Sequence, residues 1–240
     1  MAPPADVEGV TTAAAGTPSI VRDVQAVRSR VSIACERAGR DATSVTLIAV
    51  SKTQPPEAII AAWQAGIRDF GENYVQEALA KLGPVRAAAG DGPLFHFIGH
   101  LQRNKAKSAA GAFAILHSVD SERLLDAIHA AAPPAPIPVM FEVNVAAEPS
   151  KSGVVPGELA ALVAHARSLG SVRALGLMTV PPVAGTPDAS RLIFRQLREL
   201  GETLGLPALS MGMSGDFEVA IEEGATYVRV GRAIFGERLS

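Results

Sequence analysis

The sequence predicts a (β/α)8 barrel, an α/β fold in which eight parallel strands alternate with helices, and two observations support that prediction. Apolar runs of strand length, rich in β-branched residues, recur eight times with segments of helical periodicity between them. No G-x-G-x-x-G loop follows the first run, which disfavours the open doubly wound sheet that similar alternation could form. The eight runs are residues 45–52, 67–72, 95–99, 114–120, 137–145, 172–180, 208–213 and 226–236.

A helix should precede the first strand. Apolar residues in the segment that ends near Gly39 fall on one helical stripe. They are Val21, Val24, Val27, Val31 and Ile33 or Ala34. Residues 1–18, rich in Ala, Pro, Gly and Thr, predict a disordered tail, which leaves residues 19–240 for one barrel domain. The barrel then occupies about 190 residues, fewer than the usual ~250, so its loops must be short.

Composition narrows the class of protein. The net charge is -2, so no basic excess is available to neutralise the phosphates of a nucleic acid. No apolar run approaches the ~20 residues of a spanning helix, and the N-terminus lacks the pattern of a secretion signal. Cys35 is the single cysteine, which excludes an internal disulfide and favours a packing role. We therefore expect a cytoplasmic protein, monomeric by default, that binds neither nucleic acid nor membrane.

Lys52 ends the first apolar run, just before Pro55 and Pro56. Barrel enzymes place their functional groups at the carboxyl ends of their strands, where this lysine falls. It is either a solvated strand end or an amine positioned to form a Schiff base with a carbonyl group.

The seventh run leads into a turn of small residues that includes Gly212, Ser214 and Gly215. Ser214 could cap a helix over residues 217–223, and free amides at such a turn would bind an anion. An ordinary helix cap is the alternative interpretation. Because barrel phosphate sites often follow strands seven and eight, the position favours a phosphate.

The eighth run carries Arg229 among apolar residues and then Gly231 and Arg232, which could supply further amides to the same anion. Arg229 could instead be a buried ion-pair member or an outward-facing side chain. Strands one and eight are neighbours in a closed barrel, so an amine and two phosphate-compatible turns would face one mouth. A cofactor with an aldehyde and a phosphate fits that set, and pyridoxal 5′-phosphate is the candidate.

Other polar residues give weaker signals. Residues 72–74 lie at the end of the second run and could line the same mouth, and Lys151 is an alternative amine. His96 and His100 lack the companions of a metal site, so packing or hydrogen bonding is expected. Arg103 belongs to a basic segment that indicates a solvated face or a phosphate or partner contact.

These segments resemble the pyridoxal phosphate homeostasis proteins over about residues 20 to 238. The matching motifs are AVSKTQP, FGENYVQEA, HFIGHLQRNK, EVNVAAEPSKSG, GLMTV, LSMGMSGDFEVAIEEGAT and VRVGRAIFGER. The resemblance implies a barrel of the alanine racemase type and Lys52 as the Schiff-base lysine. It also implies phosphate contacts from Ser214 and from the backbone of residues 231–232, Arg229 facing the pyridine nitrogen, and Asn73 and Met211 near the ring. Many relatives carry Thr or Ser in place of Arg232, so one hydroxyl donor is missing here.

The resemblance implies a carrier of the cofactor that maintains its intracellular supply, with release to apo-enzymes that need it. An arginine beside the pyridine nitrogen keeps that nitrogen unprotonated, which weakens the ring as an electron sink. The similar alanine racemases use a tyrosine from an additional β domain, whereas this chain has Tyr74 and Tyr227. A non-catalytic role is therefore expected. The alternatives are a racemase-like or decarboxylase-like enzyme using Lys52, and an interaction module that uses the cofactor as a ligand.

Overall fold

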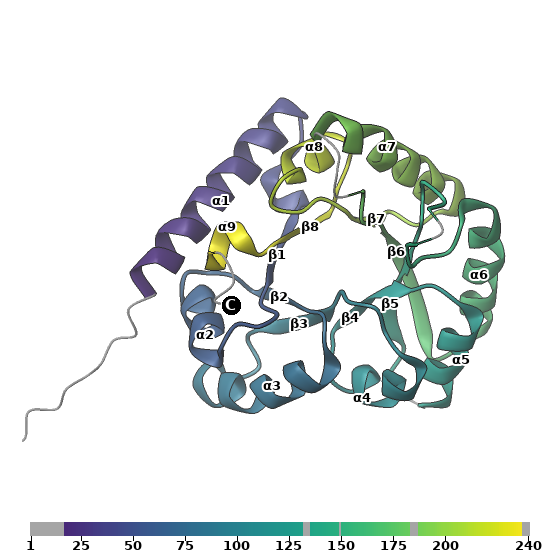
Figure 1. Cartoon of the computed structure of the whole chain (residues 1–240), viewed down its shortest axis with the longest axis horizontal. Coiled ribbons are helices and arrows are strands. Elements are labelled where there is room, and N and C mark those ends of the chain that lie inside the picture. The colour runs from purple at the N-terminus through teal and green to yellow at the C-terminus, as the bar shows by residue number, and fades with distance from the viewer. Residues whose placement is uncertain (1–16, 132–134, 149, 183–186, 237–240) are drawn as a thin grey trace, which may run out of the picture.

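The structure, a computed structural model, describes residues 17–131, 135–148, 150–182 and 187–236. Eight parallel strands close into a barrel in sequence order, with β8 paired to β1, and helices surround them (Figure 1). The strands are β1 Thr46–Val50, β2 Asp69–Glu72, β3 Leu94–Phe97, β4 Ile115–Val119, β5 Ile137–Glu142, β6 Val172–Met178, β7 Ala208–Ser210 and β8 Tyr227–Val230. The predicted (β/α)8 fold is confirmed.

Helices connect the successive strands, as parallel pairing requires, and one further helix precedes β1 and one follows β8. They are α1 Thr17–Arg37, α2 Pro56–Gln64, α3 Val75–Ala89, α4 Ala106–Ala110, α5 Glu122–Ala130, α6 Pro156–Ser168, α7 Pro187–Leu204, α8 Phe217–Glu222 and α9 Arg232–Phe235. Helices α2 and α6 begin with proline at the first position, where the missing N–H costs nothing. The last predicted strand run is divided, because β8 ends at Val230 and α9 follows at once.

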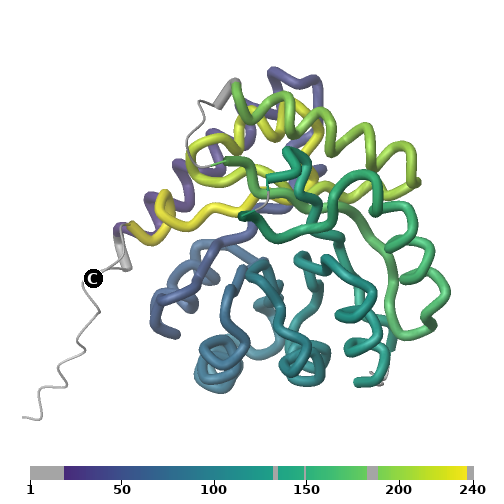
Figure 2. Tube along the Cα trace, turned by 45° about the vertical axis from the view of Figure 1, so that its right-hand side comes forward, coloured from purple at the N-terminus to yellow at the C-terminus, as the bar shows by residue number. Residues whose placement is uncertain are grey.

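Helix α1 packs outside the barrel, side by side with α9 in both views (Figures 1 and 2). Val24, Val27 and Val31 are buried as predicted, and Arg30 Nη2 forms a 2.6 Å ion pair with Glu218 on α8. Of the two alternatives for the end of the stripe, Ala34 is fully buried, whereas Ile33 is 51% exposed. Residues 1–16 of the predicted tail lie outside the described residues, and α1 begins at Thr17.

Most of the core lies between the strands and the helices. One apolar cluster there runs from Ile20 on α1 to Ile234 on α9 and includes Cys35, whose packing role is confirmed. A smaller apolar group comprises Met140, Met178 and Ala208. Among the described helices, none has the length and apolar character needed to cross a membrane.

Candidate functional site

The carboxyl ends of β1 and β8 lie against each other. These strands pair in parallel, and a Cβ placed on Gly231 would lie 3.3 Å from Cβ of Val50. Since Lys52 follows Val50 by two residues, the end of β8 approaches the turn that carries Lys52. A glycine at position 231 permits that approach. The predicted proximity of the strand-one amine and the strand-eight turn is therefore present in the fold.

The turn that carries Lys52 is held on both sides. The amide of Ser51 donates to Gly71 O at 2.9 Å, and the Ser51 hydroxyl donates to Glu72 Oε1 at 2.7 Å. Thr53 has a φ of 64°, a left-handed conformation that β-branched residues rarely adopt, and its amide donates to Glu77. Strained backbone of this kind persists only where its surroundings impose it, and it concentrates at functional sites.

A buried ion pair supports this turn from behind. Lys81 on α3 places Nζ 3.1 Å from Glu72 Oε1 and 2.8 Å from the carbonyl oxygen of Ser51. Desolvation raises the pKa of Glu72, although the Ser51 hydroxyl and Lys81 act in the opposite direction. The expectation that Glu72 lines the mouth was wrong, because its side chain is fully buried in this support. The i,i+4 spacing of Glu77 and Lys81 was visible in the sequence, but the burial of Lys81 was not.

The turn after β7 is placed beside β8, because the Arg229 amide donates to Gly212 O at 3.0 Å. The predicted capping role of Ser214 was wrong: α8 begins at Phe217 with Asp216 at the N-cap position. The Asp216 side chain makes no capping hydrogen bond to the helix, and its carboxylate instead accepts from the Met213 amide at 2.7 Å. Among the described residues, the amides of Ser214 and Gly215 have no recorded hydrogen-bond partner.

The turn after β8 offers similar groups. Gly231 is the N-cap residue of α9, and the amides of Gly231 and Arg232 have no recorded partner within the described part of the chain. The Arg232 side chain is exposed. Helices α8 and α9 have six and four residues, so free amides, rather than a helix dipole, are what these two turns present.

Arg229 points into the barrel. It is 4% exposed and donates to Ser210 O and Ser210 Oγ at 2.7 Å each and to Thr179 O at 2.9 Å. Burial lowers its pKa to about 10, against the attraction of Glu142 and Asp216. Arg229 therefore does not face outward, and no carboxylate in the described part of the chain forms an ion pair with it. Neutral oxygens hold its guanidinium. Its Nε–H and one Nη2–H have no recorded partner among the described residues.

Asn73 follows β2 at the same end of the barrel. Its Oδ1 is buried and has no hydrogen-bond partner within the described residues. The backbone of Asn73 approaches Gly99 so closely that only a glycine fits there, since a Cβ on Gly99 would lie 2.3 Å from Asn73 O. Met211 is fully buried and packs in the main apolar cluster.

These groups fit a cofactor that carries an aldehyde, a phosphate and a ring nitrogen. Lys52 offers the amine, the turns after β7 and β8 offer unpartnered amides, and Arg229 retains N–H donors inside the barrel. The unpartnered Asn73 Oδ1 adds an acceptor. A buried polar atom without a partner is costly, so such atoms indicate a ligand that satisfies them.

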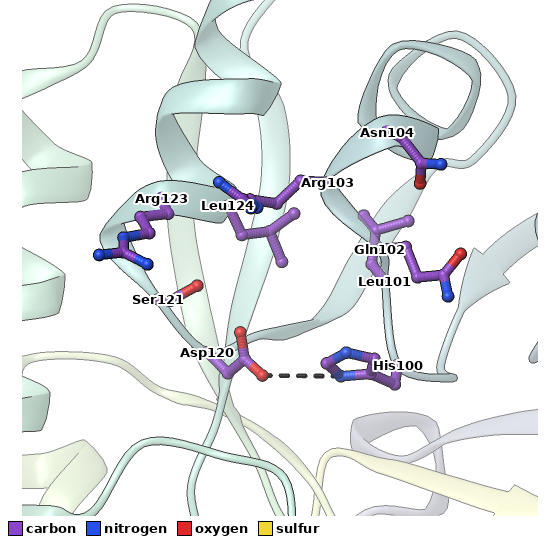
Figure 3. A pocket seen from close by; sticks show the side chains of 9 residues that line it. All are labelled: His100, Leu101, Gln102, Arg103, Asn104, Asp120, Ser121, Arg123 and Leu124. Carbon is purple, nitrogen blue, oxygen red and sulfur yellow. Dashed lines mark ion pairs between the residues drawn. The ribbon is translucent and has the colours of Figure 1, made fainter.

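A cavity of about 830 Å³ lies elsewhere on the same rim, between residues 100–104 and residues 120–124 (Figure 3). Arg103 lines it, and His100 Nδ1 lies 3.7 Å from Asp120 Oδ2. No group of side chains in the described residues could hold a metal ion, and His96 is hydrogen-bonded inside the barrel, as expected. The alternative amine, Lys151, forms a 3.1 Å ion pair with Glu148.

Comparison with known proteins gives consistent results. Residues 22–239 match the family described as "Alanine racemase, N-terminal domain". The chain is 46% identical to the pyridoxal phosphate homeostasis protein of Aquifex aeolicus over 220 residues, 88% of this chain and 95% of that protein. It is 45% identical to the protein of that name in Pseudomonas aeruginosa over 227 residues, 92% and 96% of the two chains. The structure of PipY from Synechococcus elongatus with PLP bound is 35% identical, with a TM-score of 0.79, over 90% of this chain and 100% of that one.

Proposed function

This chain belongs to the family of the pyridoxal phosphate homeostasis proteins, within the wider alanine racemase N-terminal domain family, and on that premise we propose that it binds and carries pyridoxal 5′-phosphate. The observation that most supports the proposal is the convergence of the Lys52 turn with two turns of unpartnered amides and an inward-facing Arg229. The PLP-bound structure of PipY supports the same ligand.

In this proposal each group has one role. Lys52 would hold the cofactor through its ε-amine, and the aldehyde would supply a reversible covalent link. The backbone amides of Ser214, Gly231 and Arg232 would donate to the phosphate. Arg229 would donate to the ring nitrogen, and Asn73 and Met211 would flank the ring. The support behind Lys52, formed by Glu72 and Lys81, limits the motion of its turn.

We propose carriage of the cofactor without catalytic turnover. With a pKa of about 10, Arg229 remains a cation at neutral pH and cannot give the ring nitrogen a proton there. Tyr74 is 57% exposed, and Tyr227 packs edge-on against the His117 ring within the barrel, with centroids 5.7 Å apart. Neither tyrosine is thus held as an acid or base opposite Lys52.

The test is the visible absorption spectrum of the protein with added pyridoxal phosphate, followed by borohydride reduction and peptide mapping. We expect an imine band and a reduced adduct on Lys52, absent in Lys52→Ala and retained in the matched control Lys151→Ala. An adduct on Lys151 would reject the assignment of the amine. Turnover of free amino acids that Lys52→Ala abolishes would replace the carrier role with a racemase-like or decarboxylase-like activity.

The phosphate contacts need separate variants. Ser214→Asp places a carboxylate against the phosphate, and Gly231→Val fills the space beside Val50. Each should weaken cofactor retention at least about tenfold, because a charge-assisted hydrogen bond is lost or opposed. Wild-type affinity in either folded variant would remove that turn from the site.

We further propose that a cytoplasmic monomer releases the cofactor to apo-enzymes. When the loaded protein is mixed with an apo-enzyme that requires pyridoxal phosphate, the activity of that enzyme should return. The rate of this reactivation should exceed the rate at which the loaded protein releases cofactor to a scavenger of free cofactor. Equal rates would reject direct transfer. Light scattering during gel filtration measures the oligomeric state.

A further inference from the structure

Polar side chains from five strands form a continuous line of contacts inside the barrel. Asp69 Oδ1 lies 2.9 Å from His96 Nε2, and His96 Nδ1 lies 3.0 Å from His117 Nε2. His117 Nδ1 lies 2.9 Å from Ser210 Oγ, which accepts from Arg229 Nη1 at 2.7 Å. We call these five residues the interior chain. Strands β4 and β7 are not neighbours, so the contact between His117 and Ser210 crosses the interior.

The interior chain is shielded from water over most of its length. His117 and Ser210 are fully buried, and Arg229 is 4% exposed. Only at Asp69, the first residue of β2, does a side chain of the interior chain reach 20% exposure. The Tyr227 ring packs against both histidines. Buried hydrogen bonds in such surroundings are strong when every member is satisfied and costly when one is not.

With both histidine rings neutral, the contacts allow one consistent direction of hydrogen donation. A carboxylate only accepts, so His96 Nε2–H donates to Asp69, which leaves Nδ1 of a neutral His96 as an acceptor. His117 Nε2–H then donates to His96, and His117 Nδ1 accepts from the Ser210 hydroxyl. Burial, His96 and Arg229 together hold the pKa of His117 well below its usual value, in agreement with a neutral ring.

At its other end the interior chain meets a group that only donates. Arg229 has no acceptor capacity, so Ser210 Oγ must accept from it, which matches the direction set at Asp69. Ser210 and Thr179 occupy three of the five N–H donors of the guanidinium and therefore fix its plane. The two remaining donors are left for a ligand.

We propose that the interior chain is a positioning device for Arg229, which makes the site select ligands whose ring nitrogen is an unprotonated acceptor. Asp69, His96, His117 and Ser210 are then positioning residues that touch no ligand. A cationic ring nitrogen would meet a fixed guanidinium, with charges of like sign and no hydrogen bond. The inference rests on the proposed function, because it places the cofactor ring against Arg229.

The first measurement requires no ligand. Nitrogen-15 NMR of the histidines in the free wild-type protein should show His117 as the neutral Nε2–H tautomer at pH 7. A Nδ1–H tautomer or a protonated ring at His117 would overturn the direction of donation and with it the interior chain.

The second measurement compares the affinity for pyridoxal 5′-phosphate with that for its N-methyl derivative, a permanent cation at the ring nitrogen. The wild type should prefer the unmodified cofactor by about 100-fold, from a lost hydrogen bond and like-charge repulsion. His117→Phe interrupts the interior chain and should reduce that preference about tenfold. The matched control is His165→Phe, since His165 forms a 2.8 Å contact with Asp126 outside the barrel.

A structural role alone would lower the melting temperature of His117→Phe and leave the ratio of the two affinities unchanged, and that result would reject the proposal. If His117→Phe does not fold, Ser210→Ala removes one hydroxyl group and is judged by the same ratio. A wild-type protein that binds neither compound would reject the proposed function and the selection together. The tautomer of His117 measured without ligand would still decide whether the interior chain exists.

Discussion

The inside of the barrel and the layer between barrel and helices are built from opposite kinds of side chain. The layer between strands and helices, which we call the shell, is mainly an apolar cluster from Ile20 to Ile234, with the Glu72–Lys81 ion pair buried in it. The inside of a barrel is usually filled by layers of branched aliphatic side chains, but here the interior chain occupies much of it. We infer that the shell supplies most of the stability, while the interior orients the candidate site.

The largest effect should follow from a cavity in the shell. Phe194 on α7 is fully buried, so Phe194→Ala should lower the free energy of unfolding by about 3–5 kcal/mol. Leu192 on the same helix is 65% exposed, and Leu192→Ala should change it by less than about 0.5 kcal/mol. Denaturant titration measures both. A loss below about 1 kcal/mol for Phe194→Ala would show that the shell is not the main source of stability.

The next largest effect concerns the buried ion pair behind Lys52. Lys81→Met leaves Glu72 without its cation and Ser51 O without a donor, which should cost about 3 kcal/mol. The Thr53 amide should also exchange its hydrogen faster, because its acceptor Glu77 loses the same lysine. Lys107→Met, at an exposed position on α4, is the control. Unchanged stability and exchange in Lys81→Met would show that the turn is held by its backbone alone.

The shell could be predicted from the sequence because the periodicity of apolar residues indicates directly which positions are buried. The valine stripe of α1 and all eight strands followed from it, and the closed topology then placed Lys52 beside the end of β8. The interior chain could not be predicted. Its members are spread from Asp69 to Arg229, and alternation along a strand tells which residues face inward but not which of them meet.

Two local errors concern polar residues at the ends of strands. Ser214 was expected to cap the helix after β7, but that helix begins at Phe217, which puts Asp216 rather than Ser214 at the N-cap position. Glu72 was expected at the mouth because it ends a strand, but its side chain pairs with Lys81, nine residues later on α3, and is buried between β2 and that helix. The direction in which a polar side chain at a strand end points can therefore be predicted only when its partner is known.

The interior should also titrate, which the apolar residues of the shell cannot do. His117 has a depressed pKa in the folded protein, from burial and from the nearby His96 and Arg229, with Asp69 beyond His96 and Tyr227 against the ring. Stability from a neutral buried histidine is present above the unfolded value of about 6.5 and is lost as the pH falls toward the folded pKa.

The free energy of unfolding should fall by up to about 1.4 kcal/mol per pH unit for one proton. Urea titrations of the wild type between about pH 6.5 and 5 should show it, above the range where most carboxylates titrate. His117→Phe should remove that slope, and the control His165→Phe should keep it. An identical slope in both variants would mean that His117 titrates normally in the folded protein, contrary to its place in the interior chain.

The smallest effect belongs to the cavity beside β3 and β4, which is part of neither the interior nor the shell. Arg103 lines it with an exposed side chain (Figure 3). The proposed cofactor groups lie at the ends of β1, β2, β7 and β8. Arg103→Ala should therefore change stability by less than about 0.5 kcal/mol and pyridoxal phosphate affinity by less than about twofold. Equilibrium titration should give one bound cofactor per chain in both proteins. A tenfold loss of affinity in Arg103→Ala would move the ligand to the cavity, because no route through the interior chain connects Arg103 to Arg229. If the wild type binds a second cofactor and Arg103→Ala does not, the cavity lined by Arg103 and the proposed site each bind a phosphate group independently.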